Sequence, residues 1–169
     1  DEKLGKTAKK PGQGADLRNK LYRDLNGLGE LVERITHQWK STAKRRFNPK
    51  WNKMEYYNGY IIGLDERPIF VPNEHQLLVY LLQSDEAIMM EAAYCRFHQS
   101  MERAGFIYGE DYGTVCWYHD EFTVECKESI SKDVAKIAEE SISWAGNYFK
   151  IACPHIGQAK IGKNWYDIH

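Results

Sequence analysis

The sequence lacks several features that define common protein classes. No apolar run approaches the roughly 20 residues that a membrane-spanning helix needs, so we expect no membrane partner. No internal repeat is visible. No two of the cysteines have Cys-x-x-Cys spacing, which makes zinc-binding and redox roles weak interpretations and favours free thiols in a reducing, cytoplasmic environment. The cysteines are Cys95, Cys116, Cys126 and Cys153.

The start of the chain lacks both an initiator Met and a signal peptide, because it reads Asp1-Glu2-Lys3. We therefore expect a fragment, a processed product or a trimmed chain. The 169 residues correspond to about one domain, and 43% of them are hydrophobic. That share is enough for a core and too high for a disordered chain.

The chain also has almost no net charge, but its charges are unevenly distributed. Residues 1–53 contain 14 Lys and Arg against 6 Asp and Glu, a balance of +8, whereas the remainder has a balance of −9. This asymmetry predicts that the first third contacts a polyanion while the rest carries carboxylate chemistry.

The basic first third is expected to be mostly helical. Residues 1–15 are rich in Lys and Gly and predict a flexible basic loop. Apolar residues then recur every three or four positions from Asp16 to Trp39, which predicts helix with Asp16 as the N-cap. Gly27 and Gly29 should divide this run into two helices. Basic and aromatic residues alternate from Lys40 to Tyr60, which suits phosphate contacts and base stacking, although composition alone favours a solvated surface helix and loop.

Two hairpins and two amphipathic helices are expected beyond residue 55. Tyr56 to Val71 predicts a hairpin in which Pro68 marks an edge strand. A long helix should begin at Asn73 and end near Gly105, and its polar interruption at residues 83–86 indicates either a wet cleft or a solvent-facing turn. A second helix should begin at a Ser129 or Ser131 cap, and a final strand should follow near the end of the chain. This order predicts an α+β fold with helices on one face of an antiparallel sheet.

The stretch from Thr114 to Cys126 predicts the second hairpin, with His119-Asp120-Glu121 at its tip. Adjacent carboxylates repel one another and need a cation or solvent, so a metal site and a solvated structural turn are about equally supported. Two-metal phosphoryl transfer needs more than one anchoring carboxylate. Asp111 and Glu125 are the nearest candidates in the sequence for a second one.

These residues resemble a known family. Val115 to Glu121, an apolar strand followed by His-Asp-Glu, resembles motif C of the family A DNA polymerases. The segments before it, from Gly63 to Arg67 and from His75 to Ser84, resemble the hairpin and long palm helix of the replicative polymerases of short-tailed phages. Other resemblances are at the two ends of the chain: Asp1 to Gly5 resembles the stretch after motif B, and Gly162 to Trp165 with His169 resembles the C-terminus.

The resemblance implies roles for individual residues. Asp120 is similar to the palm aspartate that binds the catalytic metals, and Glu121 is similar to its supporting neighbour. His119 is similar to the residue that touches the primer terminus. The other implied DNA-binding residues are Gln83, His75 and Arg67. The chain departs from the family at Pro72, where an Arg is frequent, and at Val79, where an Asn is frequent, which removes contacts that those side chains would make.

The resemblance also implies that the chain holds half of an active site. Residues 1–55 would be the remainder of the fingers subdomain, and residues 56–169 the C-terminal part of the palm, with a motif C hairpin packed on a long helix and a second helix. Two Mg²⁺ ions, primer–template DNA and deoxynucleoside triphosphates would be its ligands. The motif A aspartate and motif B residues would precede Asp1, so an N-terminal polymerase portion or subunit must supply them and the isolated chain should be inactive. If the chain is viral, it acts in an infected bacterial host. Binding of a processivity factor is left open.

Two other functions fit the same residues. A metal-dependent nuclease would need a third acid within this chain. A non-catalytic nucleic-acid-binding module would use the basic, aromatic-rich segment from Lys40 to Tyr60 and would bind DNA independently of Asp120.

Overall fold

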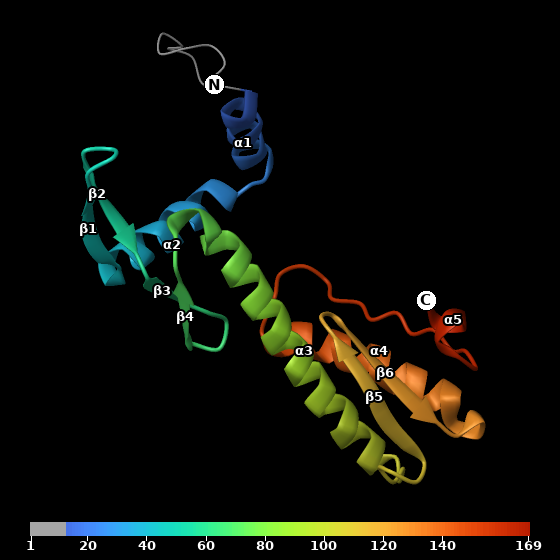
Figure 1. Cartoon of the computed structure of the whole chain (residues 1–169). Helices are drawn as coiled ribbons and strands as arrows, with labels where there is room; N and C mark the ends of the chain where they lie inside the picture. The colour runs from blue at the N-terminus through green and yellow to red at the C-terminus, as the bar shows by residue number, and fades with distance from the viewer. Residues whose placement is uncertain (1–12) are drawn as a thin grey trace. The chain divides into compact units, whose positions relative to one another are not determined.

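The structure, a computed structural model, describes residues 13–169 (Figure 1). Within these residues, helices combine with three two-stranded antiparallel sheets, so the predicted α+β class is confirmed. The predicted basic loop of residues 1–15 lies outside the described part, apart from its last three residues. The described chain divides into two compact units: unit 1 runs to Ile62 and includes Pro68–Leu81, and unit 2 contains Gly63–Arg67 and Leu82–His169. No helix among the described residues is long and apolar enough to cross a membrane.

Unit 1 begins with two helices, α1 (Gln13–Asp24) and α2 (Leu28–Thr42). The predicted break is confirmed at Gly27, whose φ of 82° is the left-handed conformation that glycine adopts most readily. Gly29 lies inside α2. The prediction that Asp16 is the N-cap is wrong, because α1 begins earlier and Asp16 lies in its first turn. A carboxylate in the first turn still interacts favourably with the helix dipole.

Two hairpins follow in unit 1. Strands β3 (Gly59–Ile62) and β4 (Pro68–Val71) form the predicted hairpin, with Pro68 opposite Ile62 at its end. Strands β1 (Lys44–Asn48) and β2 (Lys53–Tyr57) form a second hairpin, where composition favoured a surface helix and loop. The physical reason lies in the turn: the Asn48 side chain accepts the Lys50 N–H at 3.0 Å, an arrangement that reverses the chain locally.

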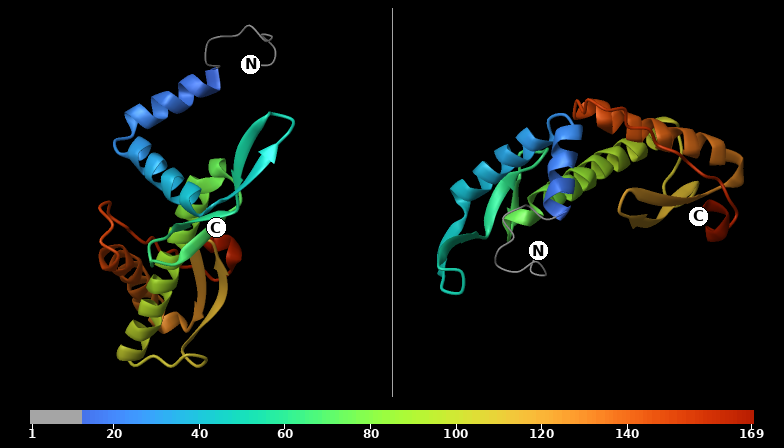
Figure 2. Two further views of the ribbon diagram at one scale, coloured as in Figure 1. Left: turned by 90° about the vertical axis from the view of Figure 1, so that its left-hand side faces the viewer. Right: turned by 90° about the horizontal axis from the view of Figure 1, so that it is seen from above.

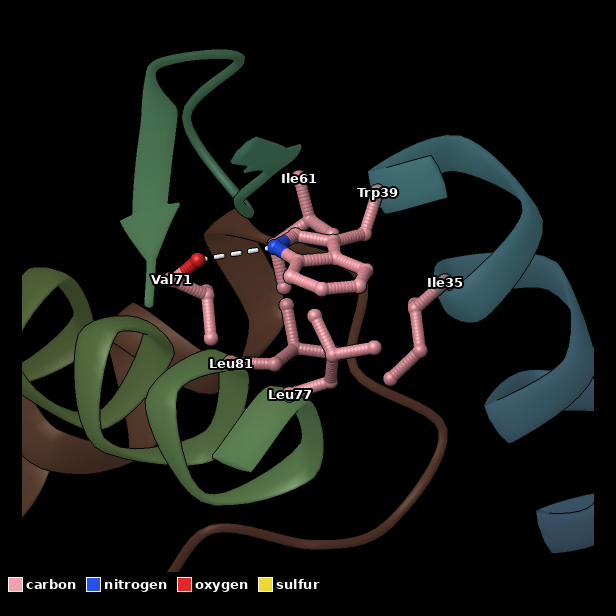
Figure 3. Packing of buried hydrophobic residues seen from close by; sticks show 6 residues of the cluster. All are labelled: Ile35, Trp39, Ile61, Val71, Leu77 and Leu81. Carbon is pink, nitrogen blue, oxygen red and sulfur yellow. Dashed lines mark hydrogen bonds between the residues drawn. The ribbon is translucent and has the colours of Figure 1, made fainter. Parts of the chain in front are cut away.

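The core of unit 1 forms around Trp39, which is fully buried. Its indole Nε1 donates a hydrogen bond to the Val71 carbonyl at 2.8 Å, so the one polar atom of the ring is satisfied (Figure 3). Gly59 passes so close that a Cβ would lie 2.6 Å from the Trp39 carbonyl oxygen. Helix α2 is thereby joined to both strands of the β3–β4 hairpin. The buried residues of this cluster are Ile35, Trp39, Ile61, Val71, Leu77 and Leu81.

The long helix is α3 (Leu77–Arg103), preceded by a 3-10 turn, η2 (Glu74–Gln76). Its predicted extent is close to that observed. Asn73 occupies the N-cap position of η2, but its side chain makes no capping hydrogen bond and instead donates to Gln76 at 3.1 Å. Gly105, with a φ of 85°, follows the end of the helix.

In unit 2, α3 and α4 (Ser131–Tyr148) cover one face of the hairpin formed by β5 (Tyr112–Tyr118) and β6 (Glu121–Cys126) (Figure 2). Alternate residues of β6 point to the same face, and those of this face pack against the buried Phe97 of α3 and Val134 of α4. This arrangement matches the predicted helices on one sheet face. The β6 residues involved are Phe122, Val124 and Cys126.

Two details of unit 2 differ from the sequence prediction. Neither Ser129 nor Ser131 caps α4: Ile130 is at the N-cap, and the Ser131 hydroxyl donates to the Glu128 carbonyl at 2.9 Å in the preceding 3-10 turn. The prediction of a final strand near the end of the chain is wrong as well. Trp165–Ile168 form a short helix, α5, because the Asn164 side chain accepts the Asp167 N–H and caps it.

Candidate active site

The tip of the β5–β6 hairpin is a two-residue turn. Tyr118 and Glu121 are the last paired residues, so His119 and Asp120 form the turn and Glu121 begins β6. His119 has a φ of 54°, and its carbonyl accepts a hydrogen bond from the Trp117 indole at 3.3 Å. The side chains of His119, Asp120 and Glu121 are all exposed. The tip therefore presents an imidazole and two carboxylates to solvent.

Helix α3 holds this hairpin in place through Tyr94. The Tyr94 hydroxyl donates to Thr114 Oγ1 at 2.8 Å. Its ring packs against Trp117 and Phe122, with centroids 4.8 and 5.5 Å apart. Since these two residues belong to the strands on either side of the turn, Tyr94 fixes the tip relative to α3. No local pattern indicated this role, because one Tyr among the apolar residues of a long helix is typical of ordinary packing.

The tip carboxylates line a cavity of about 690 Å³ within unit 2. Asp120 and Glu121 enter its lining from the hairpin, and Asp85 and Glu86 enter from α3. Of the polar interruption at residues 83–86 of α3, Asp85 and Glu86 thus line the cavity, and the wet-cleft interpretation stays a prediction. With Glu139 of α4, five acidic residues from the hairpin, α3 and α4 share one cavity whose remaining walls are mostly apolar. These walls include Met89, Met90, Ala93, Ile142 and Ala145.

Asp85 differs electrostatically from an ordinary surface carboxylate. Burial raises its pKa above the usual value for Asp, and the nearby Asp65 carboxylate raises it further. The Leu64 N–H, which donates to Asp85 Oδ1 at 2.9 Å, acts in the opposite direction. Ionised Asp85 is thus disfavoured, and a cation arriving in the cavity would relieve this penalty.

Glu121 is tied to the end of the chain. Its Oε1 lies 2.9 Å from Nε2 of His169, and the His169 ring stacks on Trp165 with centroids 4.0 Å apart. Helix α5 thereby connects to the hairpin tip through one side-chain pair. Asp120 and Glu121, although adjacent, have different surroundings, and the carboxylate of Glu121 is partly occupied by this contact.

Neither predicted second carboxylate lies at the tip. Asp111 precedes β5 and Glu125 pairs with Gly113, so both are at the opposite end of the hairpin from Asp120. Asp111 has a structural role there: Oδ2 accepts the Ile107 N–H at 2.8 Å, and Oδ1 lies 2.6 Å from Lys127 Nζ. Besides Glu121, the acids that share the cavity with Asp120 come from helices distant in sequence, Asp85 and Glu86 from α3 and Glu139 from α4.

Replacing Asp111 with Asn should make the stability of unit 2 less sensitive to acid. The hydrogen bond from Lys127 lowers the pKa of Asp111. A lowered folded-state pKa contributes stability that is present above the unfolded value of about 4 and is lost as the pH falls through the folded-state pKa. The wild type should therefore lose this contribution below about pH 4, whereas Asp111→Asn should lack it at every pH.

Urea unfolding at neutral pH and in acid would measure this difference. Glu125→Gln, an exposed change on the same hairpin, is the matched control and should leave the unfolding midpoint nearly unchanged. If acid lowered the unfolding midpoints of Asp111→Asn and the wild type equally, the structural role of the Asp111–Lys127 contact would be contradicted.

The other residues with predicted DNA contacts are exposed but are not part of the cavity lining. Gln83 is on α3, and Arg67 is ion-paired with Asp65 in the turn after β3. His75 lies in η2, within unit 1. Exposure is compatible with DNA contact, and the roles of all three remain predictions.

The donors at this cavity suit a magnesium ion only in part. Carboxylate oxygens are the ligands that Mg²⁺ prefers, and five acidic residues line the cavity. Within residues 13–169, however, no three His, Cys, Asp or Glu side chains are gathered closely enough to hold a metal. The described residues therefore fit one side of a metal site, with Asp120 as the exposed ligand at the tip.

Comparison with known proteins gives a match along the whole chain. Over an alignment of 179 positions, the chain is 28% identical to the DNA-directed DNA polymerase of Enterobacteria phage T3 and 27% identical to that of Escherichia phage T7. This chain resembles phage DNA polymerases. The resemblance predicted from the residues around the hairpin is thereby confirmed. In both cases all of this chain is covered, but it spans only about a quarter of the relative's length. No family model matches the sequence.

Proposed function

We propose that this chain is the C-terminal portion of a family A DNA-directed DNA polymerase of the phage replicative type. Residues 1–55 would complete the fingers, and residues 56–169 would form the C-terminal part of the palm. The observation that carries the proposal is the similarity of the whole chain to two phage DNA polymerases. The exposed Asp120 on a braced hairpin, beside a cavity lined by acids, is the geometry that such a role needs.

Asp120 is the metal ligand in this proposal, because it is the carboxylate at the apex of the turn. Glu121 supports the site through its contact with His169. His119, beside Asp120, would contact the backbone at the primer terminus. Gln83, Arg67 and His75 are exposed side chains that would contact DNA.

Two Mg²⁺ ions, shared with residues outside this chain, would when bound lower the pKa of the primer 3′-hydroxyl and stabilise the charge on the leaving pyrophosphate. The chain's own contribution is positioning. The Tyr94 contacts fix the hairpin, so the Asp120 carboxylate is held in place before the substrates arrive. Asp85 and Glu86 add negative potential across the cavity and favour cation entry.

The proposal includes dependence on an N-terminal polymerase portion or subunit. Two ions held 3.5–4 Å apart, roughly, need several anchoring carboxylates, usually from separate strands. The hairpin tip supplies Asp120 as its exposed ligand, while Glu121 is engaged by His169. A second aspartate and a nucleotide-binding surface would come from the partner, as would deoxynucleotide selection.

A reconstitution assay tests this proposal. The chain alone should not extend a primer on a DNA template. Adding the N-terminal portion of the same polymerase should produce template-dependent extension that requires a divalent cation. Primer extension by the chain alone, or divalent-cation-dependent DNA cleavage by it, would contradict the proposal, and cleavage would favour the nuclease alternative.

A further inference from the structure

The β1–β2 hairpin is the most basic part of the described chain, and the proposed polymerase chemistry makes no use of it. It carries five cationic side chains against the single carboxylate of Glu55. We call Lys44 to Tyr57, including the turn, the basic hairpin. Its cationic residues are Lys44, Arg45, Arg46, Lys50 and Lys53.

One face of the basic hairpin is satisfied internally. Side chains alternate between faces along a strand, and Arg46 is paired with Glu55 across the ladder. Glu55 accepts a hydrogen bond from Asn48 at 2.7 Å and lies 3.7 Å from Arg46 Nε. The guanidinium of Arg46 also lies over the Tyr57 ring, 5.1 Å from its centroid. These contacts hold the hairpin together and leave little for a ligand on this face.

The opposite face exposes large apolar side chains and also carries Arg45. Phe47 and Met54 are opposite one another and are 57% and 54% exposed. Trp51, in the turn, is 60% exposed. None of the three belongs to the core cluster of unit 1, so core packing does not explain them. A Phe, a Trp and a Met exposed together on one hairpin form a surface that a partner would cover.

Cations are held directly beside the aromatic rings. Lys50 Nζ lies over the Trp51 ring, 5.2 Å from its centroid, and the Arg45 guanidinium lies over Tyr56 at 5.0 Å. Tyr56 packs partly against the core, whereas at the exposed Trp51 a ligand with a flat ring and an adjacent anion would meet both complementary groups at once. Nucleotides joined in a strand have this combination at every step, a base beside a phosphate.

We propose that the basic hairpin binds single-stranded nucleic acid. Arg45 and Lys50 would contact the phosphates, while Trp51 and Phe47 would stack on unpaired bases. Duplex DNA fits less well because its bases are already stacked and cannot cover exposed rings. An acidic protein segment would satisfy the cations but would leave the aromatic faces without flat partners. The proposal stands on the basic hairpin alone and does not depend on polymerase activity.

Fluorescence anisotropy of the full chain with a labelled oligo(dT) of about 20 nucleotides tests the stacking part of the proposal. Trp51→Ala and Phe47→Ala should each weaken binding by about tenfold, since one base–aromatic stack is lost. Trp51→Phe keeps an aromatic face and should retain most of the affinity. Phe70→Ala is the matched control, because Phe70 is 70% exposed in the other hairpin of unit 1.

The charge part is tested by the salt dependence. Removing two phosphate contacts with Arg45→Gln and Lys50→Gln should reduce the slope of log affinity against log salt by about 1.4. The control is Lys132→Gln with Lys136→Gln, two exposed lysines of α4. Asp120→Asn should bind like the wild type, so failure of the catalytic proposal would not affect this one. Parallel titrations with oligo(rU) distinguish DNA from RNA as the source of the strand.

Three results would overturn the proposal. Unchanged binding by both Trp51→Ala and Phe47→Ala would exclude stacking. Equal affinity for a blunt duplex of the same length would show that unpaired bases are not needed. Complete competition by polyglutamate at equal charge concentration would show that the surface binds polyanions by charge alone and would favour an acidic protein partner.

Discussion

Replacing Asp120 with Ala should abolish primer extension by the enzyme reconstituted from this chain and its N-terminal portion. The substitution removes the exposed carboxylate at the turn apex without touching the Tyr94 contacts that hold the hairpin. Metal-ion charge stabilisation contributes several kcal/mol to such a transition state, so the rate should fall by at least about 100-fold. Single-turnover extension at saturating Mg²⁺ would measure this loss.

Two controls make this experiment specific. Glu121→Gln should reduce the rate less, because the amide oxygen can still contact His169 and Asp120 is left in place. DNA affinity of Asp120→Ala should change little, since the DNA-facing residues of the proposal are elsewhere. Full extension by Asp120→Ala would refute the proposed catalytic site. A parallel loss of DNA binding and thermal stability would instead indicate a structural role for Asp120.

Replacing Trp39 with Ala should have the largest effect on stability, because Trp39 is the fully buried centre of the unit 1 core (Figure 3). Large-to-small changes at such positions cost about 3–5 kcal/mol in the free energy of unfolding. The substitution also leaves the Val71 carbonyl without the indole donor that lies 2.8 Å away. Urea unfolding followed by circular dichroism would measure the loss of stability. Loss of cooperative unfolding at neutral pH would also agree with the prediction.

Trp51→Ala is the matched control for this stability experiment. It removes the same side chain from a position that is 60% exposed, and surface changes usually stay within about 0.5 kcal/mol. Trp39→Phe should lie between the two variants, because it keeps an aromatic ring but loses the hydrogen bond to Val71. Similar unfolding midpoints for Trp39→Ala and Trp51→Ala would contradict the assigned core.

Local patterns predicted much of the fold. The β3–β4 and β5–β6 hairpins, the break at Gly27 and the extent of α3 all followed from periodicity and turn residues. The β1–β2 hairpin was missed because its strands are basic, and their stability depends on cross-strand contacts such as Arg46 with Glu55. The final helix α5 was missed because one Asn164 cap determines four residues of structure.

The candidate site was predictable only in part. Asp120 could be found because a His-Asp-Glu turn between β-prone runs is a local pattern. Its neighbours in the cavity could not be found in this way, because Asp85 and Glu86 approach from a helix more than 30 residues earlier in the chain. Proximity in sequence indicated Asp111, which the pairing of β5 with β6 places at the far end of the hairpin.

The backbone at His119 has a consequence for engineering this protein. His119 has a φ of 54° in the first position of a two-residue turn, where glycine is the least strained residue. Retaining an imidazole there costs roughly 1 kcal/mol or more. Selection for thermal stability alone would therefore favour glycine at this position. Stabilised variants chosen in that way would gain a less strained turn but lose the imidazole beside Asp120. Engineering for stability should therefore leave His119 unchanged.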